Sequence, residues 1–516
     1  MELRDIFVKG SYFPLSDHED RIEKYRRNAK LTQGDHYEIF KENAQKNEMY
    51  ISANFAGLIT RKSADFLFGE KPLFSSGKKD KSKEQKALDR IVKTNKFERL
   101  CYQLALQAAT YGDAFVKIRY GQEYAGAFPE VFDKKRLIIE AVDPKKVYPQ
   151  VHPLDSTKII AYHIAEPVRV SDDDDKFVLH TESHYAGKIV YRQFEMNVII
   201  MERDGTIKQY KIGDEIPSGY SEVATGVPVP LVVHIPNFTD GTKWEGQDDI
   251  SEHISLFDEI NNRISQIGSI LDKHADPALA VPQGLLQEDE HGNSYFQVAL
   301  FKTFEVMGKE DIIPQYVTWD GKLEHAYAEL EKLIEFLMAT AEVPNVALGM
   351  GESGTSGNSG LAIKWRMNNL LSKINRKRGF FEDALKQVFA IAQMLEAFAN
   401  PREVDYEFFE VVIQFNDGLP KDETEIANRM AIRTNGSQTL SRKTALMVMD
   451  GLTEEQADAE IKRIDEEKEA AMVADPSIFN DPAELDVNKR DNKQDNANSN
   501  SDPAAQDLQK ENKPKE

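Results

Sequence analysis

The sequence predicts an α+β protein in which helices precede an antiparallel sheet and further helices follow it. Two observations carry this prediction. The apolar spacing changes from a helical period to a period of two near Ala114, and it returns to a helical period near Gly246. A chain of 516 residues is long enough for two to four domains, each with a buried core.

The first 120 residues predict two helices and a strand. Apolar positions near helical spacing predict a helix over residues 35–68, which Gly69 and Pro72 end. A second helix is expected over residues 82–110, where Ser82 and Gln85 fit a capping box. From Ala114 alternate positions are apolar, which predicts a strand.

Short alternating runs then continue to about residue 250 and predict an antiparallel sheet, with Ala-Gly, Asp-Gly and Ser-Gly in the turns. The runs are "RLIIEAV", "KKVYPQV", "KIIAYHIA", "KFVLHTESHY", "KIVYRQFEMNVIIME" and "TIKQYKI". The acidic run "SDDDDKF" between two of them is interpreted as a solvated loop, because adjacent carboxylates in a loop seldom converge on one ion.

The region from Gly246 to Pro344 predicts two helices around a small β insertion. An apolar stripe of about 24 residues runs up to Pro277, and a second begins at Leu323. The insertion between them contains the strand-like runs "YFQVALF", "TFEVMG" and "IPQYVTW". The pattern indicates a stalk with a knob at its end.

The longest periodic segment follows a glycine-rich stretch and runs from Leu361 to about Phe398. An unbroken helix of this length would extend ~57 Å, and Gly379 is a candidate bend. A strand in "EFFEVVIQFNDGLP" and three short helices separated by "TNGS" and "DGLT" come next. The polar tail from about Asp475 is expected to be disordered.

Composition excludes several classes of protein. The net charge of −22 lacks the basic footprint that a stationary nucleic-acid binder needs to displace counterions from phosphates. Cys101 is the only cysteine, which excludes a disulfide or a multi-thiolate metal site within one chain. No window approaches 18 consecutive apolar residues, so no membrane-spanning segment is expected, and the amino terminus predicts no signal peptide.

The stretch "GMGESGTSGNSG", residues 349–360, leaves several interpretations open. Its first six residues fit GxGxxG, so a nucleotide-binding enzyme is the alternative function, although that fingerprint needs a preceding strand. The interpretation without a specific function is a flexible linker before a helix with a solvated basic face. That face carries a local positive excess from Lys364, Arg366, Lys373, Arg376, Lys377 and Arg378.

Other catalytic or metal patterns are weak. His180 and His184 are four residues apart and could share one face of a predicted strand, but no third ligand stands at a matching spacing, so packed or surface histidines are expected. No GxSxG, HExxH or Cys/His pairing occurs. The sequence therefore predicts neither a catalytic centre nor a metal site.

The order of these parts resembles the portal, or head-tail connector, proteins of tailed phages, especially siphophages of Gram-positive bacteria. The resemblance covers about residues 40–470 and rests on motifs whose order and spacing are more specific than any one of them. These are "ISANFAGLITRKSADFLFGEKP", "ATYGDAFVKI", "VPVPLVVHIPNFTDGTKWEGQDDI", "VPNVALGMGESGTSGNSGLAIKWRMNNL" and "FNDGLP".

The resemblance implies a homo-oligomeric ring, usually of twelve subunits, at one vertex of the capsid, made in the host cytoplasm. The implied regions are a wing over residues 1–250, stem helices over 251–276 and 322–343, a clip over 277–321, a tunnel loop over 344–360, a long kinked helix with a return to the wing over 361–415, a crown over 416–474 and an acidic tail over 475–516.

The resemblance also implies a DNA channel without catalysis, cofactor or membrane contact. Matching positions place six residues at or beside the bore: Glu352, Ser353, Thr355, Ser356, Asn358 and Lys364. The implied partners are the terminase large subunit, a head-tail adaptor, the major capsid and scaffolding proteins, and transiently double-stranded DNA. The clip residues expected to dock terminase and adaptor are Gln287, Glu288, Asp289, Glu290, His291 and Asn293.

Overall fold

The computed structural model divides the chain into two compact units, Met1–Pro420 and Lys421–Glu516. It describes residues 5–474 except 80, 125–126, 171–175, 202–206, 218–221, 276–278, 281–286, 289–293, 296–314, 317–322, 350–359, 403, 417–422, 436–437, 451 and 453. The acidic run and the polar tail considered above lie outside the described residues.

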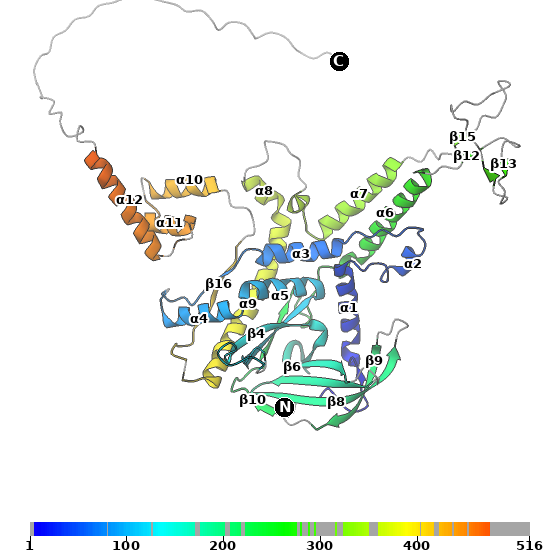
Figure 1. Ribbon diagram of the computed structural model, residues 1–516, viewed down its shortest axis with the longest axis horizontal. Helices are drawn as coiled ribbons and strands as arrows, with labels where there is room; N and C mark the ends of the chain where they lie inside the picture. Colours follow the sequence, from blue (N-terminus) through cyan, green and yellow to red (C-terminus); the bar gives the residue numbers. More distant parts are fainter. Residues whose placement is uncertain are drawn as a thin grey trace, which may run out of the picture. The chain divides into compact units, whose positions relative to one another are not determined.

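The first unit contains a large antiparallel sheet with the strand order β1-β9-β8-β7-β6-β5, and β10 pairs with β8 (Figure 1). A smaller sheet has the order β11-β3-β4, and β16 pairs with β2. The strands are β1 (Tyr12–Phe13), β2 (Leu73–Ser75), β3 (Asp113–Gly121), β4 (Arg136–Val142), β5 (Val147–His152), β6 (Asp155–Arg169), β7 (Phe177–Tyr185), β8 (Lys188–Met201), β9 (Ile207–Ile216), β10 (Glu222–Ala224), β11 (Val232–Pro236) and β16 (Val412–Gln414).

Helices cover both sheets. They are α1 (Glu19–Gln33), α2 (Lys41–Ala44), α3 (Phe55–Phe68), α4 (Lys83–Thr94), α5 (Phe97–Tyr111), α6 (Ile254–Ala275), α7 (Leu323–Thr340), α8 (Gly360–Arg366) and α9 (Asn368–Ala399). Short 3-10 turns lie at Ser16–His18, Pro144–Lys146, Ser251–His253 and Asn345–Leu348. The main core joins α3, α5 and α9 to the smaller sheet, and Phe97 of α5 stacks on Phe389 of α9 at 4.8 Å between ring centroids.

All six short runs predicted as strands are strands, and their antiparallel pairing is confirmed. Helix α1 was not predicted. Its buried side includes Arg21 and Asn28 beside Ile22 and Tyr25, so it lacks the clean apolar stripe by which a helix is identified in a sequence. Ile22 and Tyr25 pack with Tyr148 and other residues of the large sheet in a second core.

The helix predicted over residues 35–68 is wrong over much of its length. Only α2 and α3 are α-helical there, and residues 51–54 are not. The backbone N–H of Ile51 donates to the hydroxyl of Ser265 at 2.9 Å, and that of Ala53 donates to Asn261 Oδ1 at 2.9 Å. Polar side chains of α6 thus bind amides that a continuous helix would use internally. The predicted end at Gly69 is confirmed, since α3 stops at Phe68.

The helix predicted over residues 82–110 is two helices, α4 and α5. Lys96 between them has a φ of 50°, in the left-handed region, and the amide of Asn95 binds Ile91 O on one side and receives the Ile139 N–H on the other. The side chain of Ser82 caps α4 as predicted by accepting from Gln85 N at 3.1 Å. The reciprocal half of the capping box is absent, because Gln85 Oε1 accepts from Ser76 N instead.

The two predicted stalk helices are α6 and α7, which lie side by side in Figure 1. Arg263 of α6 joins them by contacting Glu329 of α7 at 3.1 Å. The apolar stripes are buried at the base of the pair, as at Phe257 and Leu337, but Leu271 and Tyr327 farther along are each 44% exposed. The pair therefore carries more apolar surface than its two helices bury against each other.

Short antiparallel pairs lie in the insertion between α6 and α7. Strand β12 (Leu279–Ala280) pairs with β15 (Gln315–Tyr316), and β13 (Gln287–Glu288) pairs with β14 (Ser294–Tyr295). The prediction of a β-containing insertion is confirmed for these residues. Most of the three strand-like runs named above falls outside the described residues.

The long predicted helix is present, but its bend is not at Gly379. Helix α9 runs through that glycine without interruption, and the break lies at Met367 between α8 and α9. Backbone hydrogen bonds from Met367 N to Ile363 O and from Leu371 N to Met367 O persist on both sides. A glycine permits a bend but does not force one.

In the second unit the described residues form three helices: α10 (Glu423–Thr434), α11 (Arg442–Asp450) and α12 (Glu454–Ala474). They confirm the three helices predicted after "FNDGLP", although α12, with 21 residues, is not short. Among the described residues of the whole chain, no helix combines the length and apolar character that crossing a membrane requires.

Candidate functional site at the base of the helix pair

Two glycines from distant parts of the sequence pack directly against each other below α6. Gly112 ends α5 with a φ of +90°, and a Cβ added to it would lie 2.4 Å from Gly246 O. A Cβ on Gly246 would lie 2.1 Å from Gly112 O. Only glycine allows this approach, because any side chain would overlap the facing carbonyl. The motifs "ATYGDAFVKI" and "TKWEGQDDI" meet at this contact.

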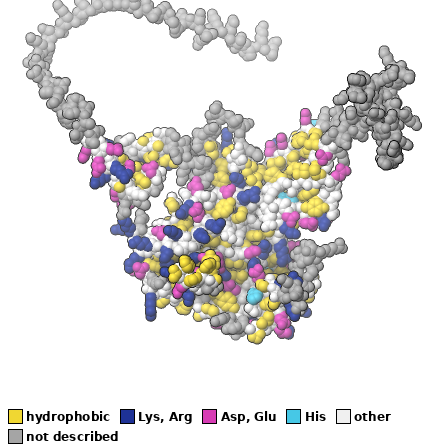
Figure 2. Space-filling model, viewed as in Figure 1, with side chains coloured by type: hydrophobic (Ala, Val, Ile, Leu, Met, Phe, Trp, Pro, Cys, Tyr) yellow, Lys and Arg dark blue, Asp and Glu magenta, His cyan; other side chains and the backbone are white. Residues whose placement is uncertain are grey.

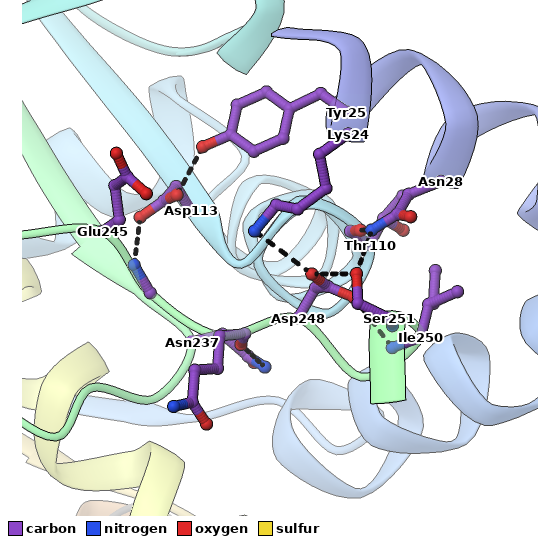
Figure 3. A network of polar contacts seen from close by, with 12 residues as sticks. Lys24, Tyr25, Asn28, Thr110, Asp113, Asn237, Glu245, Asp248, Ile250 and Ser251 are labelled. Carbon is purple, nitrogen blue, oxygen red and sulfur yellow. Dashed lines mark hydrogen bonds and ion pairs between the residues drawn. The ribbon is translucent and has the colours of Figure 1, made fainter. Parts of the chain in front are cut away.

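Asp113, which follows the first glycine, connects three elements through its carboxylate. It accepts hydrogen bonds from the hydroxyl of Tyr25 on α1 and from the N–H of Gly246 at 2.8 Å, as Figure 3 shows. His234 Nε2 of β11 lies 2.7 Å from Asp113 Oδ1, the same oxygen that accepts from Gly246, whereas Tyr25 donates to Oδ2. Asp113 is fully buried, so these partners replace the water that a carboxylate requires.

Asp248 fixes the beginning of the first stalk helix. Its Oδ1 accepts from Ile250 N at 3.0 Å and from Ser251 N at 2.6 Å, and its Oδ2 accepts from the Ser251 hydroxyl at 2.8 Å (Figure 3). Lys24 of α1 lies 3.3 Å from the same carboxylate. Asp248 therefore satisfies amides that have no partner within the helical turn, which is the role of a capping residue.

Asp249 is the centre of a buried ion cluster with the long helix. Its Oδ2 lies 2.6 Å from Lys377 Nζ and its Oδ1 lies 3.4 Å from Lys373 Nζ. Ser63 of α3 donates to Oδ2 at 2.5 Å, and Asn237 donates to Oδ1 at 3.1 Å. One carboxylate thus binds α3, α9 and the segment after β11 to the start of α6.

Burial and charge compete at this cluster. Burial alone would raise the pKa of the Asp249 carboxyl, but Lys373, Lys377 and the hydrogen bonds outweigh it and hold that pKa well below its usual range. Burial, with the neighbouring Lys373 ammonium, lowers the pKa of Lys377 to about 8 against the opposing attraction of Asp249. Because two buried cations share one carboxylate, Lys377 releases its proton at a lower pH than an exposed lysine does.

Lys373 also reaches the end of the second stalk helix, where its ammonium donates to Ala341 O at 3.0 Å. Arg376 pairs with Glu342, one of two described non-glycine residues with a positive φ. Beside these groups is a cavity of about 310 Å³, lined by residues of the β11–α6 segment, α7 and α9. Helix α9 is therefore tied to the base of both α6 and α7.

The structure describes one of the six predicted bore residues. Lys364 is exposed on α8, next to Trp365, which is 72% exposed. Glu352, Ser353, Thr355, Ser356 and Asn358 lie outside the described residues. Of the predicted docking residues, Gln287 and Glu288 form β13, whereas Asp289, Glu290, His291 and Asn293 also lie outside the described residues.

The described flanks of the glycine segment are a 3-10 turn, Asn345–Leu348, and helix α8. A dinucleotide fingerprint needs a strand directly before its glycines, and none stands there. The interpretation of the following helix as a solvated basic face is wrong in part. Lys373 and Lys377 are buried against Asp249, while Lys364 and Arg366 are exposed.

The histidines and the cysteine give no catalytic arrangement among the described residues. His180 is exposed beside Gln193, and buried His184 lies 3.0 Å from Glu182 Oε1. Burial alone would raise the pKa of Glu182, but His184 and Lys117 lower it to about 2. Burial raises the pKa of the Cys101 thiol to about 12, which keeps it protonated. No cluster of His, Cys, Asp or Glu suited to a metal ion occurs in the described part of the chain.

Sequence reasoning missed the residues that build this base, although a signal for two of them was present. Lys373 and Lys377 fall in line with the apolar positions Leu370, Ile374 and Phe381 of the long helix, where a charge predicts a buried partner. Asp113, Asp248 and Asp249 stand beside the glycines of quoted motifs, but each has a partner more than a hundred residues away: Gly246, Lys24 and Lys377 respectively.

Comparison with known proteins identifies the family of the chain. A family model described as phage portal protein, SPP1 Gp6-like, matches residues 13–474, which include both glycine motifs, the helix pair, the glycine segment and α9. A comparison with curated proteins found no match. Portal proteins are oligomeric, capsid-associated and generally structural rather than enzymatic. Since the match covers most of its length, this chain belongs to the phage portal protein family of the SPP1 Gp6-like type.

Proposed function

We propose that this chain forms a twelve-membered ring at one capsid vertex, through which double-stranded DNA enters during packaging and leaves during ejection. The observation that carries the proposal is the family match over residues 13–474. The exposed apolar residues on the helix pair support oligomerisation, because Leu271 and Tyr327 gain a dry environment only when another surface covers them.

Within this proposal the regions take the roles of the family. Helices α6 and α7 are the stem, the insertion between them is the clip, the large sheet and its helices are the wing, and α10 to α12 are the crown. The clip, with Gln287 and Glu288 in β13, docks the terminase large subunit during packaging and the head-tail adaptor later. The ring also nucleates assembly of the scaffolding and major capsid proteins.

The glycine segment is proposed as the tunnel loop, with Glu352, Ser353, Thr355, Ser356, Asn358 and Lys364 at or beside the bore. A conduit must let DNA slide, so many phosphate contacts would be a disadvantage, and an acidic chain with few cations near the constriction suits passage. The ion cluster at Asp249 supports this assignment, because it fixes α9 to the core through Lys373 and Lys377. Helix α8 lies on the other side of the break at Met367, so this cluster does not hold it.

Electron microscopy of the purified chain tests the ring. A closed ring with a central hole is the expected result, and a monomer at every concentration would contradict the proposal. A ring that binds DNA tightly and holds it in place would contradict the conduit, since passage requires weak contacts.

A substitution in α8 tests the tunnel loop. Lys364→Asp is expected to leave the ring intact but to reduce DNA packaging in a terminase-driven assay several-fold, because a repulsive charge would face the passing phosphates. Lys86→Asp, at an exposed position of α4, is the matched control, and this variant is expected to package DNA normally. Equal packaging by Lys364→Asp and the wild type would show that α8 does not border the channel.

A further inference from the structure

The connection between β3 and β4 displays large apolar side chains to solvent. Phe132 is 80% exposed, Val131 79%, Tyr124 53% and Phe128 50%. These four residues are called the aromatic patch below. Hydrophobic side chains gather on the near face of Figure 2, over the region where Figure 1 labels β4. None of the four belongs to a hydrophobic core cluster of the described residues.

Buried polar contacts hold the patch in place. Asp133, which is 4% exposed, accepts from Glu123 N and Tyr124 N at 2.9 Å each. Gln122 donates to Asp133 O at 3.0 Å, and the Phe132 N–H donates to Pro129 O at 2.9 Å. Tyr124 and Phe128 meet edge to face at 4.9 Å. The described residues of this connection are therefore held by these contacts, and their apolar side chains do not fold back onto their own sheet.

The size of the patch indicates a contact that works with others. Aromatic side chains bury about 150–250 Å² each, so three partly exposed aromatic rings and Val131 together offer on the order of 400–500 Å². A stable two-protein interface needs about 800 Å² from each partner. The patch is too small to hold a separate dimer, but it suits one element of a larger repeated interface.

We propose that the aromatic patch docks on the next copy of this chain in the assembled oligomer. The inference rests on the proposed ring, in which each subunit contacts its neighbour through two different faces, as closed rings require. The rim of the patch carries both signs of charge, with Glu130, Lys134 and Lys135 exposed. Such a rim suits a second copy of an acidic chain better than it suits a nucleic acid, which needs a basic surface.

Serine substitutions in the full-length chain test the inference. Phe132→Ser and Val131→Ser combined are expected to raise the concentration of half-assembly about tenfold or more, measured by analytical ultracentrifugation and native mass spectrometry. Leu154→Ser is the control, because Leu154 is 92% exposed on a different turn and lies outside the patch. Its half-assembly concentration is expected to equal that of the wild type.

The outcomes separate the two proposals. If the wild type forms no oligomer, the proposed ring is wrong. If the wild type and the patch variant assemble with the same concentration dependence, the patch does not contact a second copy, and a different protein covers it or nothing does. Because the substituted side chains are exposed, the thermal melt of the unassembled variant should match the wild type, which distinguishes weakened docking from misfolding.

Discussion

At the scale of single residues, the informative feature is a pair of lysines in an apolar stripe. Lys373 and Lys377 occupy positions of α9 that face the core, and both pair there with the single carboxylate of Asp249. A buried ion cluster of this kind contributes little net stability compared with apolar residues, but breaking it is costly. Its main effect is to fix the position of α9 relative to Asp249, because a buried charge is stable only beside its partner.

Removing the shared carboxylate tests this account. Asp249→Asn is expected to lower the free energy of unfolding by about 3 kcal/mol, since two buried ammonium groups lose their counterion. Urea unfolding monitored by circular dichroism measures the change. Asp214→Asn is the control, because Asp214 pairs with Lys9 at the surface with both side chains mostly exposed, and the expected loss is within about 1 kcal/mol. Equal losses for the two variants would contradict a special role for Asp249.

The lowered pKa of Lys377 predicts a dependence of stability on pH. Between its folded value of about 8 and the ordinary 10.5, the unfolded state keeps a proton that the folded state has released. The contribution of this group to the free energy of unfolding therefore rises as pH increases through that window, and below about pH 8 the burial penalty is fully present.

Lys377→Met removes this titration. Relative to the variant, the wild type is expected to gain on the order of 1 kcal/mol or more between pH 8 and pH 10, as followed by urea unfolding at fixed temperature. The variant Lys86→Met, at an exposed position of α4, should follow the wild-type curve. A constant difference between wild type and Lys377→Met at all pH values would show that the buried lysine does not titrate in this range.

At the scale of elements, the start of the first stalk helix, α6, is fixed by two loops, one after α5 and one after β11. Gly112 after α5 and Gly246 after β11 bring their backbones together, and Asp113 and Asp248 then fix β3 and the turn before α6. The main strands of the large sheet were predictable because apolar and polar residues alternate within each of them. Helix boundaries such as Asn95 to Lys96 instead depend on partners in other elements.

Gly112→Ala is expected to destabilise the protein by more than about 3 kcal/mol, because left-handed strain adds to a clash in which the new Cβ would lie only 2.4 Å from Gly246 O. Gly187→Ala separates the two effects. Its φ is +84° but a Cβ there meets nothing within 4 Å, so only the strain of about 1–2 kcal/mol is expected. Thermal melts of the two variants measure the difference, and similar losses would mean that the glycine contact is unimportant.

At the scale of the whole molecule, the chain consists of two units whose boundary lies at Pro420 and Lys421. This boundary is within a few residues of the start predicted for the last helical region at residue 416. The first unit keeps β16 and its pairing with β2, which closes the structure after α9. The second unit has a small core around Met430, Ala445 and Ala457.

A chain ending at Pro420 is expected to melt at a temperature close to that of the full chain, because its core and sheets are complete. A chain ending at Asn400 is the comparison. It loses Val411 and Ile413, which are buried in the main core, together with strand β16, and is expected to melt several degrees lower. Differential scanning fluorimetry gives both values. A large drop for the chain ending at Pro420 would contradict the independence of the first unit.

The sequence by itself determined the fold class, the strands of the large sheet, the helix pair with its insertion and the three terminal helices. These elements follow from local periodicity, and the family follows from motifs in a fixed order. The tertiary structure alone decided where helices break and which partners the buried charges have. Residues 51–54 are not helical because α6 binds the amides of Ile51 and Ala53, and the long helix is interrupted at Met367 rather than at Gly379. Lys373 and Lys377 pair in the core with Asp249, which is more than a hundred residues away in the sequence. Such features depend on contacts between distant segments, and periodicity within one segment does not identify the partner.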